Sequence, residues 1–162
     1  MVVLKWLVVL VALLVLAVVA AGRLGWLRGT PPPDLGVKDG RLKGLPATPN
    51  CVSSQAALYP DHPMRAFAEI APLPLRGDAT VTLARLQTIV AGMEGGRVVR
   101  TGPDYLYAQY TTKLLQFVDD VEFWVDPVAQ VVQVRSASRI GHGDRGVNRA
   151  RVEEIRRQLT GA

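Results

Sequence analysis

The chain opens with a long apolar segment. Residues 6–21 are apolar without a break, and the apolar residues 1–4 bring the stretch to the roughly 20 residues that a helix needs to cross a bilayer. Lys5 can extend its ammonium group toward the lipid head groups while its stem stays in the apolar layer. The pattern therefore predicts a transmembrane anchor over residues 1–22.

A cleaved signal peptide is the alternative for this segment. Small residues that suit a cleavage site stand at Val18 and Ala20, or at Val19 and Ala21. However, the 16 unbroken apolar residues exceed the usual signal core of about 7–15 residues, and the basic region before them is the single Lys5. We therefore expect an anchor or an uncleaved signal.

Prolines, glycines and charged residues interrupt the apolar pattern after this segment. Residues 28–45 read RGTPPPDLGVKDGRLKGL, and their three consecutive prolines favour an extended, semi-rigid start. We expect residues 23–44 to be a tether without packed structure. The remaining residues 45–162 have the usual length of one domain.

Helical spacing first appears in the middle of the chain. Leu83, Leu86, Val90 and Met93 recur at intervals of three and four, and Asp78 stands where a helix N-cap is expected. This spacing predicts a helix over residues 79–93, ended by the glycines that follow. Before it, the apolar residues 66–73 run into prolines, which predicts a short edge strand.

After residue 96 the period of the pattern changes to two, which is typical of strands. Glycine, proline and aspartate mark the turns between the alternating stretches. The predicted strands cover residues 97–101, 105–112, 117–125 and 128–137.

The last two of these strands have a register that side-chain chemistry can specify. Setting Phe123 opposite Val132 gives one wholly apolar face, and the same register sets Asp120 opposite Arg135 on the other face. A slip by one residue would misalign the two buried faces.

The chain closes with a second amphipathic helix, predicted over residues 147–159, with Val152, Ile155 and Leu159 inward. Two helices on one face of an antiparallel sheet of four to five strands is the simplest layered solution. The sequence thus predicts an α+β domain preceded by a transmembrane helix.

Charge adds a local feature to this picture. The formal net charge is +5, and from Arg135 onward seven arginines face only Asp144, Glu153 and Glu154. Such a patch suits phosphate, nucleic acid or anionic lipid head groups, although a solvated helix face gives the same pattern.

Several classes of site have little support in the sequence. A lone Cys51 forms no disulfide within the chain, and two histidines scattered far from it do not have the paired spacing of zinc ligands. We therefore expect no metal and no cofactor. Few aromatics and a membrane segment also argue against nucleic-acid binding.

Three polar motifs carry a family resemblance. They are PNCVSSQ (residues 49–55), FVDDVEF (residues 117–123) and RSASR (residues 135–139), the last followed by glycines, an aspartate and an Asn-Arg pair. Together they resemble domain-of-unknown-function family 1499 over about residues 45–160. The resemblance implies the architecture and no established activity. It implies no disulfide here, because Leu45-Pro46-Ala47 stands where relatives often have another cysteine. It also argues against a catalytic role for His142.

The third motif is the candidate ligand site. Its glycines let backbone amides approach a ligand, and the helix start that follows offers free N–H groups and a positive dipole. Guanidinium groups would add bidentate bonds to a phosphate or carboxylate. The candidate ligand-binding residues are Arg135, Ser136, Ser138, Arg139, Arg145, Asn148 and Arg149.

The alternative for this motif is structural. Asp144 or Asn148 would then cap the helix, and the arginines would pair with Asp119, Asp120 or Glu122. Asp119 in particular shares a face with apolar residues, so it needs a partner such as an arginine, a hydroxyl or amides of residues 136–141.

Catalytic residues are less well supported than binding residues. The candidates are Cys51 or Ser138 as nucleophile and Asp119 or Asp120 as base. Cys51 is also a good candidate for a small buried hydrophobe.

These patterns support three hypotheses about function. The first is a non-enzymatic, membrane-tethered domain of the cell envelope that binds an anionic small molecule, a lipid head group or a protein partner through the Arg/Ser/Gly loop. The second is a hydrolase or transferase acting on a phosphate- or acyl-containing substrate, and the third is a structural assembly protein.

The side of the membrane depends on two opposing signals. Lys5 favours an inside N-terminus, whereas Arg23, Arg28, Lys38 and Arg41 favour the opposite. Because long domains translocate largely regardless of charge, we expect the domain outside the cytoplasm, on the periplasmic side in a Gram-negative source.

Overall fold

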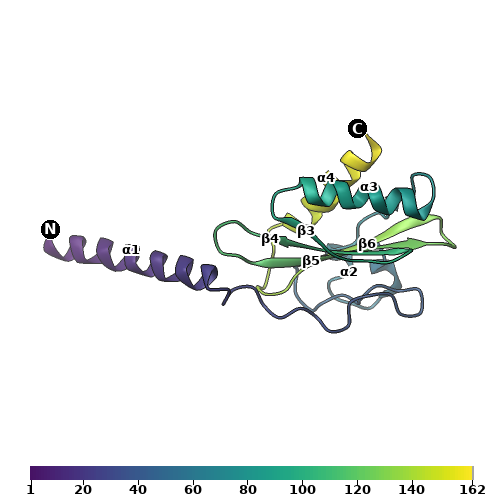
Figure 1. Cartoon of the computed structure of the whole chain (residues 1–162). Coiled ribbons are helices and arrows are strands. Elements are labelled where there is room, and N and C mark those ends of the chain that lie inside the picture. Colours follow the sequence, from purple (N-terminus) through teal and green to yellow (C-terminus); the bar gives the residue numbers. More distant parts are fainter. Residues whose placement is uncertain (162) are drawn as a thin grey trace.

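An antiparallel sheet of six strands forms the centre of the computed structural model, which describes residues 1–161 (Figure 1). A long helix leads away from the sheet, and two further helices lie over one of its faces. In chain order the elements are α1 (Val2–Arg23), β1 (Cys51–Ser53), the 3-10 turn η1 (Ala56–Leu58), α2 (Arg65–Ala68), β2 (Leu73–Pro74), α3 (Ala79–Gly92), β3 (Gly96–Thr101), β4 (Tyr105–Thr111), β5 (Val118–Asp126), β6 (Val131–Ser138) and α4 (Val147–Thr160).

Four consecutive strands make up most of the sheet. The spatial order is β1-β6-β5-β4-β3, and β2 pairs with β6 beside β1. The α+β class is therefore confirmed, with six strands in place of the expected four to five. The strand without a predicted counterpart is β1. Strands β1 and β2 have three and two residues, so neither is long enough to show alternation.

Helix α1 has the length and composition of a membrane span. Its 22 residues extend about 33 Å at 1.5 Å per residue, and its most apolar window has a mean hydropathy of 3.1 with none of it buried. A signal sequence has the same properties. At its end Gly22 lies against the β4–β5 loop so closely that a Cβ there would be 2.6 Å from the carbonyl oxygen of Leu115.

Helix α3 confirms the helical prediction in the middle of the chain. Asp78 is its N-cap and accepts a hydrogen bond from the backbone N–H of Val81 at 2.8 Å. Leu83, Leu86 and Val90 are buried, as the spacing predicts. The inward stripe of α4 is confirmed as well, since Val152, Ile155 and Leu159 are buried.

The predicted strand over residues 66–73 is wrong. Residues Arg65–Ala68 form a single helical turn, and only Leu73 and Pro74 pair with β6. Pro72 and Pro74 have no N–H to donate to a ladder, which limits this pairing to two residues. Leu73 between them is fully buried.

The face of the sheet beneath α3 and α4 carries the main core. Large apolar side chains from β4, β5 and β6 meet the buried stripes of both helices there. Phe123, Leu86 and Ile155 are completely buried in this cluster. We call this side of the sheet the helix face.

The observed register of β5 and β6 differs from the predicted register by two residues. Phe123 faces Val134 instead of Val132, and Asp120 faces Ala137 instead of Arg135. The hairpin loop is longer than expected because the Asp126 carboxylate accepts the N–H groups of residues 128 and 129. Since the shift is even, every side chain stays on its predicted face.

The opposite face of the sheet is covered by residues 31–43, which we call the cover segment. Leu42 is 3% exposed and packs with Tyr105, Tyr107 and Trp124. The expectation that this part of the tether has no packed structure is therefore wrong. In Figure 1 the cover segment runs below the sheet, on the side away from α3 and α4.

Hydrogen bonds hold the cover segment in place. The Gly36 N–H donates to the Glu122 carboxylate at 2.7 Å, and the Leu42 N–H donates to the Gln55 side chain at 2.8 Å. The Gln55 amide in turn donates to the Gly40 carbonyl at 2.9 Å. Composition favoured a tether because it gives no sign of these distant acceptors.

The packing of the cover segment can be tested by truncating Leu42. Leu42→Ala should lower the free energy of unfolding by about 2–5 kcal/mol, as for other buried leucines. The measurement is urea unfolding of the full chain in detergent. Leu58→Ala is the matched control, because Leu58 is 46% exposed. Equal effects of the two substitutions would contradict the packing described above.

Candidate functional site

The RSASR motif lies on β6, where alternation divides its side chains between the two faces of the sheet. Ser136 and Ser138 point to the helix face, whereas Arg135 points to the face under the cover segment. Arg139, just after the strand, joins Arg135 on that side. The predicted single site thus consists of two separate clusters.

On the helix face, Asn148 of α4 is the centre of a buried polar network. Its amide nitrogen donates to the Asn50 carbonyl at 3.1 Å, to the Ser138 hydroxyl at 3.1 Å and to Asp144 at 2.8 Å. Its amide oxygen accepts from the Ser136 hydroxyl at 2.5 Å. Asn148 and Ser136 are fully buried. The network fastens the PNCVSSQ motif, β6 and α4 to one another.

Arg151 is the partner that Asp119 requires. One of its terminal nitrogens donates to the Asp119 carboxylate at 2.6 Å, and the guanidinium lies 4.5 Å from the centre of the Tyr110 ring. The other terminal nitrogen donates to Asn148 and Ser136 at 2.6 Å and 3.1 Å. Burial raises the pKa of Tyr110 to about 12. Sequence reasoning missed Arg151, although it lies on the same side of α4 as Asn148 and Val152.

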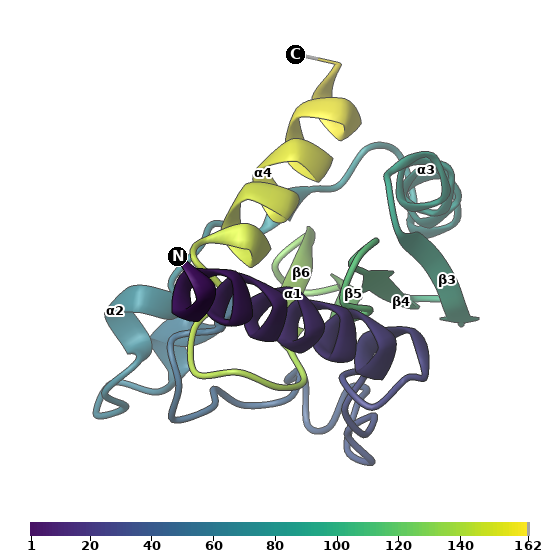
Figure 2. The ribbon, with the colours of Figure 1, turned by 90° about the vertical axis from the view of Figure 1, so that its left-hand side faces the viewer.

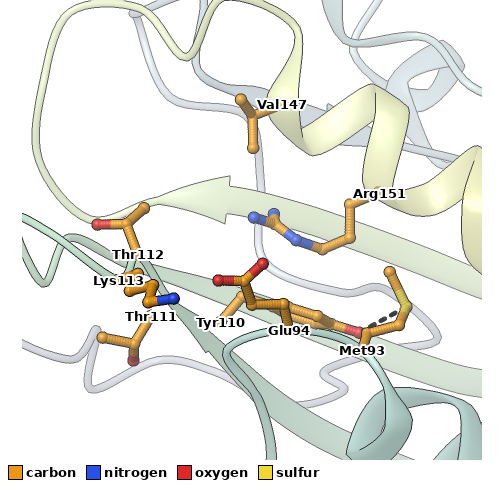
Figure 3. Close-up of a pocket in the computed structure, with 8 residues that line it drawn as sticks. All are labelled: Met93, Glu94, Tyr110, Thr111, Thr112, Lys113, Val147 and Arg151. Atoms are coloured by element: carbon orange, nitrogen blue, oxygen red, sulfur yellow. Dashed lines mark hydrogen bonds between the residues drawn. The ribbon is translucent and has the colours of Figure 1, made fainter.

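A cavity of about 440 Å³ opens beside this arginine (Figure 3). Figure 3 shows Arg151 extending over Tyr110, with Lys113 and Glu94 nearby. Both terminal nitrogens of Arg151 already donate to protein groups, namely Asp119, Asn148 and Ser136. Among the described residues, none that lines this cavity has a buried donor without a partner.

The start of α4, where an anion was expected, is capped by the protein itself. The Asp144 carboxylate accepts the backbone N–H groups of Gly146 and Asn148 at 2.9 Å and 3.0 Å. Partial burial alone would raise the pKa of Asp144. The hydrogen bonds that its carboxylate accepts have the larger effect, so its pKa lies below the usual value. Arg145 is exposed, and Arg149 donates to the Phe67 carbonyl at 2.6 Å. Neither arginine reaches the others of the candidate set.

Under the cover segment, two carboxylates of β5 are buried with aromatic and arginine partners. Asp120 receives two hydrogen bonds from Arg139, at 2.9 Å and 2.7 Å, and one from the Tyr107 hydroxyl at 2.6 Å. Glu122 receives one from the Tyr105 hydroxyl at 2.7 Å, in addition to that from Gly36. Asp120 is 2% exposed and Glu122 is fully buried.

Arg135 is the exception in this cluster. It is 3% exposed, yet its Nε and Nη1 have no hydrogen-bond partner within residues 1–161. Its nearest carboxylate oxygen, Oε2 of Glu122, is 3.8 Å from Nη1 and is also without a hydrogen bond. A buried guanidinium with unused donors is costly, because it has lost its water and gained no equivalent bonds.

A small cavity of about 180 Å³ lies against Arg135. It is bounded by β5 and β6 on one side and by residues 30–46 on the other. The lining residues are Thr30, Pro32, Lys43, Pro46, Asp120, Arg135, Ala137, Ser138 and Arg139. Lys43, which sequence reasoning did not single out, pairs with Asp34.

The catalytic candidates have other partners or none. Cys51 is 1% exposed, burial raises the pKa of its thiol, and its sulfur contacts the Val52 carbonyl at 3.6 Å. The Ser138 hydroxyl accepts from Asn148. Within residues 1–161 neither nucleophile is hydrogen-bonded to a base, and Asp119 and Asp120 are each paired with an arginine. The same residues contain no group of three His, Cys, Asp or Glu suited to a metal ion.

The Asp119–Arg151 pair can be tested by removing the carboxylate. Asp119→Ala should lower the free energy of unfolding by about 3–5 kcal/mol, because it leaves a buried guanidinium without its counter-charge. Denaturant unfolding of the full chain measures the effect. Glu153→Ala removes a carboxylate from a surface pair and should change stability by less than about 1 kcal/mol. A folded Asp119→Ala protein as stable as the control would rule out the structural role.

The pH dependence of stability reports on Glu122. Burial raises the pKa of Glu122 above its usual 4.5, despite opposing hydrogen bonds from Tyr105 and Gly36 and the nearby charge of Arg135. The folded state therefore binds a proton more tightly than the unfolded state, and stability should fall as pH rises from about 4.5 through the raised pKa. Glu122→Gln should remove this decline. Parallel pH profiles of the two proteins, measured by thermal melting, would be the contrary result.

Comparison with known proteins agrees with the motifs. The family model described as "Protein of unknown function (DUF1499)" matches residues 41–159. No match was found among curated proteins or among solved structures. The matched region includes all six strands of the sheet and the residues of both polar clusters. The chain therefore belongs to the DUF1499 family.

Proposed function

We propose that this protein is a membrane-anchored domain that binds a small anion in the cavity beside Arg135. The observation that carries the proposal is the buried guanidinium of Arg135, which has unused N–H donors and lines that cavity. Neither donor is open to a water molecule, so the guanidinium would have to turn slightly toward the cavity before a carboxylate or phosphate there accepted those N–H groups. Such charge-assisted bonds are about twice as strong as neutral ones. Arginine suits this task because its fork of donors matches the geometry of both anions.

The other cations of the cavity support this assignment. Arg139 and Lys43 also line it, but each is matched by a carboxylate, Asp120 for the first and Asp34 for the second. These two side chains place positive charge beside the cavity, but their ion pairs leave them less available than Arg135 to bind a ligand. Arg135, whose only ion-pair contact within residues 1–161 is the 3.8 Å approach to Glu122, supplies the donors that a ligand would use.

The size of the cavity limits the class of ligand. At about 180 Å³ it holds several water molecules of roughly 30 Å³ each, and it is smaller than the roughly 300–1,000 Å³ of sites for drug-sized molecules. A small carboxylate or inorganic phosphate fits these limits. A nucleotide or a whole lipid does not.

Anchorage is the second half of the proposal. Helix α1 is apolar along its length, and its most apolar window has no contact that buries it in the domain. The chain just after it is packed closely on the domain, since a Cβ at Gly29 would be 2.8 Å from Ile140 and 2.9 Å from Arg139. This junction supports an anchor that stays with the domain. We place the domain on the extracytoplasmic side, because long domains translocate largely regardless of flanking charge.

Thermal melting of the full chain in detergent tests the anion site. Phosphate or acetate should raise the melting temperature in a saturable way, since a ligand at 100 times its dissociation constant adds about 2.7 kcal/mol of stability. Chloride at equal ionic strength serves as the reference. Arg135→Gln should abolish the shift, and Arg135→Lys should weaken it because it keeps the charge and loses the fork.

Arg145→Gln is the matched control for these variants. It removes the same charge from an exposed position outside the cavity, so it should leave the anion-dependent shift unchanged. The proposal fails if no anion shifts the native protein beyond the chloride reference. It also fails if Arg135→Gln and Arg145→Gln respond to the anions alike.

A further inference from the structure

One end of the domain lies next to the point where α1 leaves it. The β4–β5 loop meets the chain after α1 there, with a hydrogen bond of 3.1 Å from Arg28 to Gln116. Gly22 approaches Leu115 of the same loop, and Gly29 approaches Ile140 in the loop between β6 and α4. Figures 1 and 2 show α1 leading away from this end, in front of it when the end faces the viewer. We call it the anchor end.

Exposed apolar side chains gather at the anchor end. Trp26 is 76% exposed, Leu24 is 69% exposed and Leu114 is 58% exposed. Ile140 lies beside Gly29 and is also exposed. Removing these apolar side chains from water would lower the free energy of the protein. A tryptophan next to an apolar helix is typical of the interface between membrane and water.

Unpaired cations accompany these apolar residues. Arg23, Lys113 and Arg145 are exposed, and the ion pairs found within residues 1–161 include none of them. The 440 Å³ cavity and a second cavity of about 240 Å³, which shares Thr112 and Val147 with it, both lie at this end. Of the acids that line them, Asp119 is paired with Arg151 and Asp144 accepts N–H groups at the start of α4. Glu94, the third of these acids, has no ion pair with a described residue. The surface is therefore apolar and positive.

From this combination we infer that the anchor end docks on the bilayer surface and binds anionic lipid head groups. The C-terminal end of a spanning α1 lies at the level of the head groups, and the β4–β5 loop is in direct contact with it. Trp26 and Leu114 enter the interface, while Arg23, Lys113 and Arg145 meet the negative charge of the lipids. The inference rests on the anchorage in the proposed function and is independent of the Arg135 cavity.

The opposite end of the sheet differs in composition and provides an internal control. The β5–β6 hairpin turn carries Val128, which is 91% exposed, and its neighbour Asp126 is acidic. Because β4, β5 and β6 run between the two ends, a docked anchor end holds this turn away from the lipids. A probe at position 128 therefore reports the behaviour of a similar apolar residue in water.

Fluorescent labelling of the full chain in lipid nanodiscs tests the inference. Leu114→Cys and Val128→Cys can be labelled selectively because native Cys51 is buried. The discs contain phosphatidylcholine alone or phosphatidylcholine with an equal amount of phosphatidylglycerol, and iodide is the water-soluble quencher. In the anionic discs the label at 114 should be quenched several-fold less than the label at 128. Lys113→Glu combined with Arg145→Glu should abolish this protection.

A label at Leu10→Cys, within α1, separates failure of docking from failure of anchorage. If position 10 is protected in both kinds of disc and position 114 is quenched as strongly as position 128, the inference is overturned and the anchor stands. If position 10 is open to the quencher, α1 does not span the bilayer, and both are overturned. Protection at 114 that is equal in the two lipids would refute the selectivity for anionic head groups.

Discussion

Burial of three carboxylates within four residues of one strand is the constraint on which the fold depends. Asp119 lies on the helix face, while Asp120 and Glu122 lie under the cover segment, and each is at most 5% exposed. A carboxylate removed from water needs hydrogen bonds and a counter-charge, or it becomes protonated. The helix α4, the loop after β6 and the cover segment supply these partners, so the acidic strand fixes where the later and earlier parts of the chain must lie.

The three arginine partners differ in how completely they meet this need. Arg151 and Arg139 form short ion pairs with Asp119 and Asp120, so these two carboxylates are neutralised within the protein. Arg135 is too far from Glu122 for a hydrogen bond. Buried donors without partners are rare in folded proteins and call for an explanation, and the proposed anion site is the explanation offered for Arg135.

Local patterns predicted the elements well, and the site only in part. The helix stripes of α3 and α4 and the alternation of β4 to β6 are local properties, so the residues themselves show them. The face of each β5 side chain was predicted correctly although the register was wrong, because a shift by two residues leaves every side chain on the same face. The sequence does not show which distant residue lies beside each charged group. Examples are Arg151 beside Asp119, the Gly36 amide beside Glu122 and Lys43 beside Arg135, all of which depend on the tertiary fold. The proline-rich composition of residues 28–45 was misleading for the same reason, since its binding surface is built from residues far downstream.

The position of the cover segment also sets an order of events during synthesis. Residues 31–43 leave the ribosome before any strand of the sheet, yet they pack on Tyr105, Tyr107 and Trp124. They cannot dock until those much later residues have been made and paired, so the earliest part of the domain to be translated is among the last to find its place. Until then Leu42 stays in water, and the long loop that must close adds to the entropy cost of folding and slows it.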